Sequence, residues 1–474
     1  MANIIYGMFN VARTALLTQQ KALDITANNI ANVNTEGYSR QRVNMEQNEP
    51  VYYEGGTLGT GVSANQVIQR IYDRFLSAQI ADAASTKGRW DAQLETLEKA
   101  ELMFDDASGY GLSDAMAEFW NSWQDVANNP SGYTERATLM ANAEYMTEVF
   151  NKLSDDLSQV RTDSDQNIIG AVDDINTLTG EIAELNLKIA EVEAGSLHSA
   201  NDFRDERDLK LKELAGLIDV NSFEDADGYL TITSASGHTL VDRTQSWELV
   251  TAPNPLNSGL HDIYWTSSSG AQEEITDDIS TGKLKGWLEA RDSIIPGYQS
   301  QLDDMAVAMA TAVNTQHNNG LDLNGDDGLD FFTSTTGAGD IAVNSAIADD
   351  VNLIAAALYD PDPALSESPP GGNGNALAMV DIQSQMLMNG STATIDDYYN
   401  GLISDVGRYV SQASVNAEHQ ETVSLQLDTY REEISGVSMD EEMVNLVQFQ
   451  SAYNAAAKLV SAVDEMLQTL IDMV

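Results

Sequence analysis

The chain of 474 residues contains no cysteine, so it has neither a disulfide framework nor thiolate chemistry. Its start, MANIIYGMFNVARTALL, lacks the basic region of a secretory signal, and Arg13 interrupts the apolar segment that such a signal requires. No apolar run approaches the roughly eighteen residues needed to span a bilayer. These absences predict a protein that is either cytosolic or exported by a route without a cleaved signal.

Basic residues are also scarce. The chain has 24 lysines and arginines against 74 acidic residues, which gives a formal net charge of −50 at pH 7. A surface this negative repels nucleic acid and anionic membranes, so we expect no nucleic acid and no membrane as a partner. Solubility in a salty medium, where counterions screen a dense carboxylate surface, is one interpretation of this charge. Such an adaptation would reflect habitat rather than activity.

Both ends of the chain have the periodicity of long amphipathic helices, because apolar side chains recur every three or four residues along one face. The first stripe comprises Ile5, Phe9, Ala12, Leu16, Leu23 and Ile30, and the second comprises Met443, Val447, Gln450, Tyr453, Ala457, Val460, Leu467 and Leu470. Residues 1–45 contain four basic and two acidic side chains, whereas 436–474 contain one basic and six acidic side chains. This charge difference favours pairing of the ends with each other or with neighbouring copies. Two surface helices packed on a core are the alternative.

Between the ends, the pattern changes twice. Helical periodicity covers most of residues 86–217 and returns at 285–318 and 376–435. Residues 218–284 instead hold short segments of alternating apolar and polar side chains, separated by turn residues, which is typical of β-strands. A loop-rich insert spans 319–375. The chain is therefore helical on both sides of a β segment.

This order predicts a mainly α fold with a β insertion, built as an elongated multi-domain rod. Residues 1–45 and 436–474 would pair as a coiled coil of terminal helices. Residues 46–217, completed by 285–318 and 376–435, would form a helical-bundle domain. We expect the small β domain to be inserted distally, at the end of the rod opposite to the two termini.

No catalytic or metal-binding pattern stands out. The five histidines are scattered singly, and no nucleophile elbow, zinc motif or dinucleotide-binding fingerprint occurs. Asp322, Asn324 and Asp326 have the spacing of the first calcium-loop ligands, but the later glycine and glutamate of such a loop are missing, which favours a polar turn. The glycine-rich stretch 55–61 lacks the Gly-Lys-Ser/Thr ending of a phosphate-binding loop, so we expect a hairpin or loop there. We expect no cofactor and no enzymatic activity.

Five stretches, in order along the chain, resemble the flagellar axial family, whose members build the rod, hook, junctions and filament of bacterial flagella. They are TANNIANVNTEGYSRQRV, GTGVSANQVIQRIYDRFLSAQI, FWNSWQDVANNPSGYTERATLMANAEYMTEVFNKL, NDFRDERDLKLKELAGLIDV and SGVSMDEEMVNLVQFQSAYNAAAKLVSAVDEMLQTLIDMV. The first stretch is similar to rod and hook proteins as well. The others resemble a protein of the hook–filament junction.

The resemblance implies a structural component of the extracellular flagellum that forms the junction between hook and filament and allows flagellin to assemble. It implies export through the flagellum's own secretion channel and terminal helices that pair as a coiled coil lining the central channel. The implied partners are copies of the chain, the hook protein and a second hook-associated junction protein. A dedicated cytoplasmic chaperone would guard the C-terminal helix. The hook protein, another axial protein and an enzyme displayed on flagellar termini are the alternatives.

The same resemblance suggests a role for the asparagine-rich stretch that follows the first apolar stripe. Asn28, Asn29 and Asn32 would hydrogen-bond to neighbouring subunits or cap a helix end. A polar linker that ends the helix is the alternative. We therefore group these three asparagines with the two terminal stripes as the predicted assembly interface.

Overall fold

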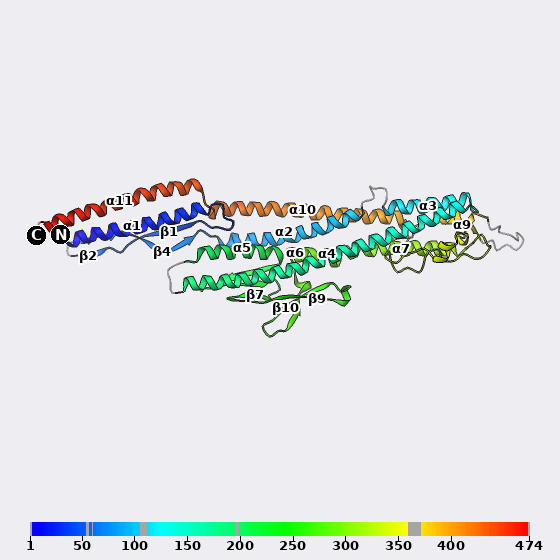
Figure 1. The fold of residues 1–474 in the computed structure, drawn as a ribbon, viewed down its shortest axis with the longest axis horizontal. Helices are drawn as coiled ribbons and strands as arrows, with labels where there is room; N and C mark the ends of the chain where they lie inside the picture. Colours follow the sequence, from blue (N-terminus) through cyan, green and yellow to red (C-terminus); the bar gives the residue numbers. More distant parts are fainter. Residues whose placement is uncertain are drawn as a thin grey trace.

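The two ends of the chain lie together at one end of a long rod (Figure 1). The computed structural model describes residues 2–53, 56–58, 60–104, 111–194, 199–358 and 371–472. Helix α1, Ala2–Ala31, and helix α11, Met439–Asp472, pack side by side and run in opposite directions. The predicted fold class is confirmed: the chain is mainly helical, its terminal helices are paired, and small antiparallel sheets are inserted.

The body of the rod is made of helices that run along its length. They are α2 (Arg74–Glu101), α3 (Leu112–Asn128), α4 (Tyr133–Glu193), α5 (Asn201–Leu217), α6 (Gly282–Glu289), α7 (Ile295–His317), α8 (Ser345–Asp349), α9 (Gly374–Ile382) and α10 (Ile395–Ser435). The longest, α4, has 61 residues and is about 90 Å long. Its buried residues Ile168, Ile175 and Ile182 are seven apart, so one face stays against the neighbouring elements over several turns.

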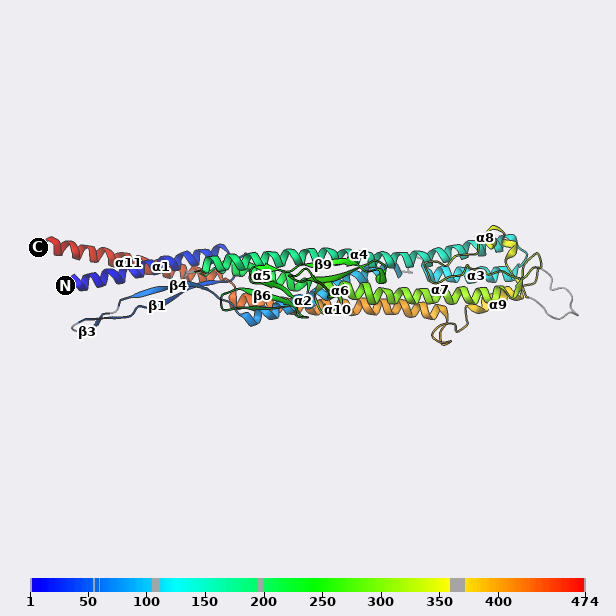
Figure 2. The same ribbon diagram turned by 90° about the horizontal axis from the view of Figure 1, so that it is seen from below.

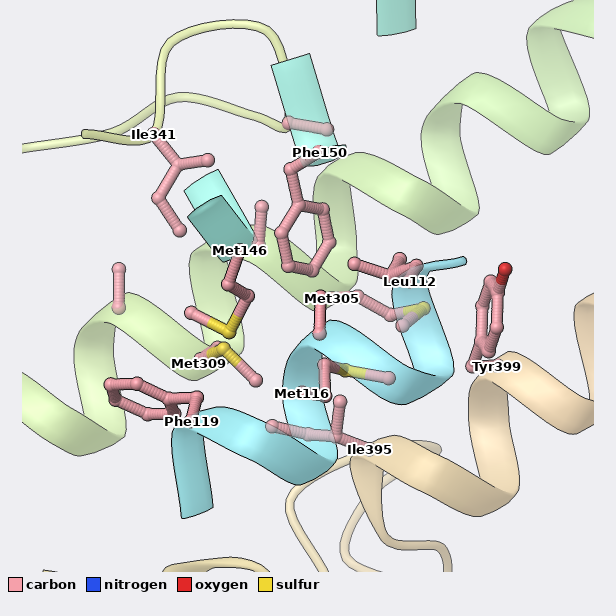
Figure 3. Packing of buried hydrophobic residues seen from close by; sticks show 14 of the residues in the cluster. Leu112, Met116, Phe119, Met146, Phe150, Met305, Met309, Ile341, Ile395 and Tyr399 are labelled. Atoms are coloured by element: carbon pink, nitrogen blue, oxygen red, sulfur yellow. The ribbon is translucent and has the colours of Figure 1, made fainter. Parts of the chain in front are cut away.

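A hydrophobic core fills the end of the rod opposite to the termini. Side chains from α3, α4, α7 and α10 meet there, among them Phe119, Phe150, Met305 and Tyr399 (Figure 3). The four methionines that the figure labels have flexible side chains, which fill irregular gaps between the helices. This core fixes the helices of the rod to one another without any disulfide.

A long hairpin extends from the rod toward the termini and lies beside α1 (Figure 2). Strand β1, Gln41–Gln47, pairs antiparallel with β4, Val62–Arg70, and the shorter strands β2, Val51–Tyr53, and β3, Gly56–Leu58, pair beyond them. The hairpin predicted for the glycine-rich stretch is therefore confirmed. Gly55 and Gly59 themselves lie outside the described residues.

The β segment between α5 and α6 forms two small antiparallel sheets. Their strands are β5 (Val220–Glu224), β6 (Leu230–Ser234), β7 (Thr239–Asp242), β8 (Gln245–Ser246), β9 (Leu249–Pro253), β10 (His261–Thr266) and β11 (Gln272–Glu274). One sheet has the order β5-β6-β7-β8 and the other β11-β10-β9. Asn186 on α4 binds the first sheet as a strand would, because its amide donates to the Leu230 carbonyl and accepts from the Leu230 N–H.

The position of these sheets differs from the distal position expected above. They lie beside the middle of α4, and the far end of the rod is formed by α3, α9 and the segment after α7 (Figure 1). The physical reason is the length of α4: its middle, from Ile168 to Ile182, is an apolar face that the sheets cover, while its first turns belong to the core at the far end. The domain boundaries given above stay a prediction.

The segment after α7 is packed rather than loose. Strands β12, Gly320–Leu321, and β13, Ala357–Leu358, pair, and Phe331 and Phe332 are fully buried. The Asp322 carboxylate accepts hydrogen bonds from the backbone N–H groups of Asn324 and Asp326, so it closes a turn on itself. In the described ranges no three acidic or histidine side chains are grouped as metal ligands.

A buried histidine gives the far end of the rod a dependence on pH. His317 Nδ1 hydrogen-bonds the Leu329 carbonyl, while Nε2 accepts from the Ala355 N–H, which requires the neutral ring. Burial is the main cause that lowers the pKa of His317 from 6.5 to about 4. The stabilisation by the neutral ring is complete above pH 6.5 and is lost as the pH falls toward 4. In this range His317 binds a proton in the unfolded chain but stays neutral in the folded chain, so protonation favours unfolding.

We therefore expect His317→Gln to reduce the acid sensitivity of unfolding. Between pH 7.5 and pH 5, wild-type His317 should lower the free energy of unfolding by about 2 kcal/mol, whereas glutamine can donate to Leu329, accept from Ala355 and does not titrate. Urea unfolding at both pH values measures the difference. His419→Gln, at an exposed histidine of α10, is the matched control variant. Equal acid sensitivity of His317→Gln and wild type would contradict the prediction.

Candidate assembly site at the base of the terminal helices

The predicted interface residues of α1 lie on more than one of its faces. Ala12 and Asn29 are buried, and Asn28 is exposed. The other predicted residues whose side chains are described are partly buried, namely Phe9, Leu16, Leu23, Ile30 and Asn32. The side chain of Ile5 lies outside the described part of the structure. The predicted α1 stripe thus contributes both to the contact within the chain and to the surface.

On α11 the predicted stripe and the buried stripe are different. Met443, Val447, Gln450 and Leu467 are exposed, Tyr453, Ala457 and Val460 are partly buried, and the side chain of Leu470 lies outside the described part. The residues that face α1 are Glu442, Phe449, Ala456 and Val463, of which Phe449 is partly buried and the others are buried. Because these four are seven residues apart, they form one seam of a coiled coil. The role of the predicted stripe in assembly remains a prediction.

Asn29 lies at the point where α1, the start of β1 and the start of α11 meet. Its Nδ2 donates to the Gln41 carbonyl (2.9 Å) and to Glu442 Oε2 (3.2 Å). Its Oδ1 accepts from the Tyr38 hydroxyl (2.9 Å) and from the Gln41 N–H (3.0 Å). An asparagine amide offers two donors and two acceptor lone pairs, so Asn29, only 1% exposed, is fully satisfied. We call Asn29, Tyr38, Arg40, Gln41 and Glu442 the Asn29 cluster.

Arg40 supplies the positive charge of the cluster. Its Nη2 lies 2.7 Å from Oε1 of the buried Glu442, and its Nη1 lies 2.7 Å from Oε2 of Glu441. The Arg40 backbone N–H also donates to the carbonyl of Ser435, the last residue of α10. Both glutamates are in the first turn of α11, where the helix dipole favours negative charge. Arg40 therefore binds the end of α10 and the start of α11 together.

The cluster is tied to the rod through α5. Asp205 accepts from the Ser39 N–H (2.8 Å) and forms an ion pair with Arg70 at the end of β4 (2.9 Å), and Gln41 Nε2 donates to Asp202 (2.7 Å). Gly37 has a φ of 81° and lies against the Leu209 side chain. It provides the backbone turn that brings residues 38–41 back to α5. The terminal helices are thereby bonded to the rod at their base.

Electrostatics keep these groups in the protonation states that the hydrogen bonds need. Burial, and then Asp202, Asp205 and Glu442, raise the pKa of the Tyr38 phenol, so it stays a donor to Asn29. Burial opposes the charge of Arg70, but the carboxylates of Asp208 and Asp205 outweigh it and raise its pKa. Tyr38 therefore keeps its proton and Arg70 its charge at ordinary pH.

The remaining asparagines of the stretch act locally. Asn32 Nδ2 donates to the carbonyl and the Oδ1 of Asn28, and the Thr35 hydroxyl donates to Asn32 Oδ1. These bonds close the last turn of α1, which is the capping role that the sequence allowed. Asn29 alone of the three reaches across the molecule.

Sequence reasoning missed the partners of Asn29. Tyr38, Arg40, Gln41 and Glu442 are not among the predicted interface residues, although they lie in the stretches that resemble axial proteins. The signal in the sequence that could have identified Glu442 is its seven-residue spacing from Phe449, which continues to Ala456 and Val463.

The described helices include none that is long and apolar enough to cross a membrane.

Family models match three parts of the chain. Residues 97–332 match the "Flagellar hook-associated protein FlgK helical domain", residues 430–473 the "Flagellar basal body rod FlgEFG protein C-terminal", and residues 9–38 the "Flagella basal body rod protein". The last two matches include Asn29 and Glu442, so both sides of the cluster belong to matched regions.

Full-length relatives agree with these matches. Flagellar hook-associated protein 1 of Bacillus subtilis (strain 168) is 32% identical over 513 residues, covering 100% of this chain and 99% of the relative. Flagellar hook-associated protein 1 of Escherichia coli (strain K12) is 27% identical over 550 residues, covering 98% and 100%.

A solved structure shows the same fold. The flagellar hook junction protein FlgK from Burkholderia pseudomallei superposes with a TM-score of 0.67 at 16% identity, over 75% of this chain and 100% of that one. With the full-length relatives, this fold shows that the chain belongs to the family of flagellar hook-associated protein 1, the structural, non-enzymatic proteins of the junction between the flagellar hook and filament.

Proposed function

We propose that the terminal helices are the interface through which this chain joins its neighbours in the flagellum. As a member of an axial family, the chain assembles with other axial proteins. We infer that these are copies of itself, the hook protein and a second hook-associated junction protein. The observation that carries the proposal is the apolar surface that α11 leaves exposed, which we call its open apolar face. Its exposed large side chains are Met439, Met443, Val444, Val447, Leu459, Met466, Leu467 and Ile471.

Surface of this kind marks a site of association. The rod differs from α11, because the large apolar side chains of α3 and α7 are mostly buried in the core at the far end. Covering one apolar side chain contributes roughly 1.5–3 kcal/mol. Several together exceed the 4–15 kcal/mol, roughly, that association costs in lost freedom. The predicted residues Met443, Val447 and Leu467 lie on this face, so they are the first candidates for contact with a neighbour.

The same face explains why a dedicated cytoplasmic chaperone would be needed. Before export, an open apolar helix would associate with other copies inside the cell. We infer that the chaperone covers α11 until the chain leaves the cytoplasm. Within this proposal, the Asn29 cluster holds α11 at a fixed place on the rod, so that its open face points toward the next subunit.

Deleting the gene tests the function directly. We expect electron micrographs of the deletion strain to show hooks without filaments, and we expect unpolymerised flagellin in the medium, because flagellin has no junction on which to assemble. Expression of the wild-type gene from a plasmid should restore filaments. Missing hooks would assign the chain to the hook or rod instead, and normal filaments would contradict the proposal.

Removing Met443–Val474 tests the interface. The core of the rod and Glu442 are untouched by this truncation, so we expect a folded, soluble chain by circular dichroism. It should be absent from purified flagella, because the open apolar face has been removed. Immunoblots of flagella and of whole cells measure incorporation against expression. Incorporation at the wild-type level would show that α11 is dispensable and would refute the interface.

The substitution Arg40→Met tests the role of the Asn29 cluster. It leaves the buried Glu442 charge without its partner, which costs about 3 kcal/mol. We expect faster amide exchange in the first turns of α11 and in β1, with no change in α3 or α7. The double variant Arg40→Met/Glu442→Gln should exchange more slowly than Arg40→Met, because the unpaired charge is gone. Arg408→Met, at an exposed pair on α10, is the matched control. Equal exchange in Arg40→Met and wild type would contradict this role.

A further inference from the structure

A groove opens on the terminal helices next to the Asn29 cluster. It measures about 240 Å³ and lies between α1, β1 and α11. Ile25 and Ala22 are buried at its base, while Val43, Ile71 and Phe449 are partly exposed along it. Its space suits an apolar side chain of the size of leucine or methionine. We call it the base groove.

The charge at the base groove is unusual for this chain. Arg42 is exposed at its rim, and no carboxylate of the described residues lies within ion-pair distance of it. Arg40, the other cation of the lining, is already paired with Glu442 and Glu441, so Arg42 is the cation of the groove that a partner can reach. Four other grooves of the described part have neutral or net acidic linings. In a chain of net charge −50, a free arginine beside apolar side chains indicates an acidic and apolar partner.

The last turns of α11 have the complementary character. Leu467 is 38% exposed and Ile471 is 70% exposed, and Asp464 is exposed as well. Because these three residues are three and seven positions apart, they lie on one face of the helix. Residues 460–472 contain acidic side chains and no basic ones. We call Asp464, Leu467 and Ile471 the tip face.

We propose that the tip face of one copy docks in the base groove of a second copy of this chain. Leu467 enters the apolar part beside Val43 and Phe449, and Asp464 approaches Arg42. The tip face cannot reach the groove of its own chain, because α11 is continuous and the 25 residues from Glu442 to Leu467 span roughly 38 Å. The contact is heterologous, so its repetition builds a ring or an open helical array rather than a two-fold dimer. The inference rests on the proposed function, which requires copies to meet through α11.

The lack of cysteine favours a cross-linking test, because every thiol of this chain is then an introduced one. We would place the double variant Val43→Cys/Leu467→Cys in cells that lack the wild-type gene, purify the flagella and oxidise them. Docking as proposed should give a ladder of dimers, trimers and larger species on a denaturing gel. Each single variant should stay monomeric, since only a groove-to-tip bond can form a ladder. Val43→Cys/Leu256→Cys is the matched control, because Leu256 is 97% exposed and lies in the β segment.

The outcomes separate this inference from the proposed function. A double variant that is incorporated but gives no ladder would overturn the docking and leave the proposed function standing. Cross-links to a protein of another mass would also overturn it, because the occupant would be a different axial protein. Absence of the wild-type chain from purified flagella would overturn both proposals together.

Charge reversal provides a second measurement that does not depend on cysteine geometry. Arg42→Glu should reduce incorporation into flagella several-fold, and Asp464→Lys in the same chain should restore it, because the two charges then attract again. Lys283→Glu, at an exposed lysine of α6, is the control and should be incorporated normally. Equal loss in Arg42→Glu and in the double variant would overturn the pairing of these two residues.

Discussion

One buried amide organises the base of the terminal helices. The side-chain amide of Asn29 hydrogen-bonds both the N–H and the carbonyl of Gln41 at the start of β1, and it also donates to the carboxylate of Glu442. The two ends of the chain are therefore bonded to each other and to the rod at one place. Replacing the amide by an apolar group would leave the Gln41 N–H and carbonyl without partners in a buried site. The Glu442 charge is tolerated there because Arg40 and the start of a helix compensate it.

The sequence predicted the terminal helices and the helical rod because their apolar residues repeat with the period of a helix. It did not predict which face of α11 meets α1, since apolar residues fall on two neighbouring stripes. Met443 and Val447 belong to one stripe, and Phe449 and Val463 to the other. Both stripes have the period of a helix, so periodicity does not distinguish them. The shape of the partner helix determines which stripe is buried.

The roles of the individual asparagines also could not be predicted from the sequence. Asn28, Asn29 and Asn32 are chemically identical, yet one is buried and two cap a turn. What distinguishes Asn29 is a set of partners that are distant in sequence, of which Glu442 is the most remote. Periodicity is a local property, so it carries no information about such partners. The position of the β sheets escaped prediction for a related reason: the face that holds them is the middle of α4, and a helical stripe does not show which part of it meets which partner.

Charge sets the conditions under which copies of this chain can meet. Most of its basic side chains are already paired with acidic groups of the same chain, as Arg70 and Arg204 are, so few remain to attract a neighbour. Two chains that each carry a net charge of −50 repel each other unless counterions screen them. Attraction between copies must therefore come from apolar surface. In our proposal single cations such as Arg42 determine where on the chain that surface binds. In our proposal the exposed face of α11 supplies that apolar surface, and its place beside an acidic helix end confines binding to neighbours that present both an apolar groove and a free cation.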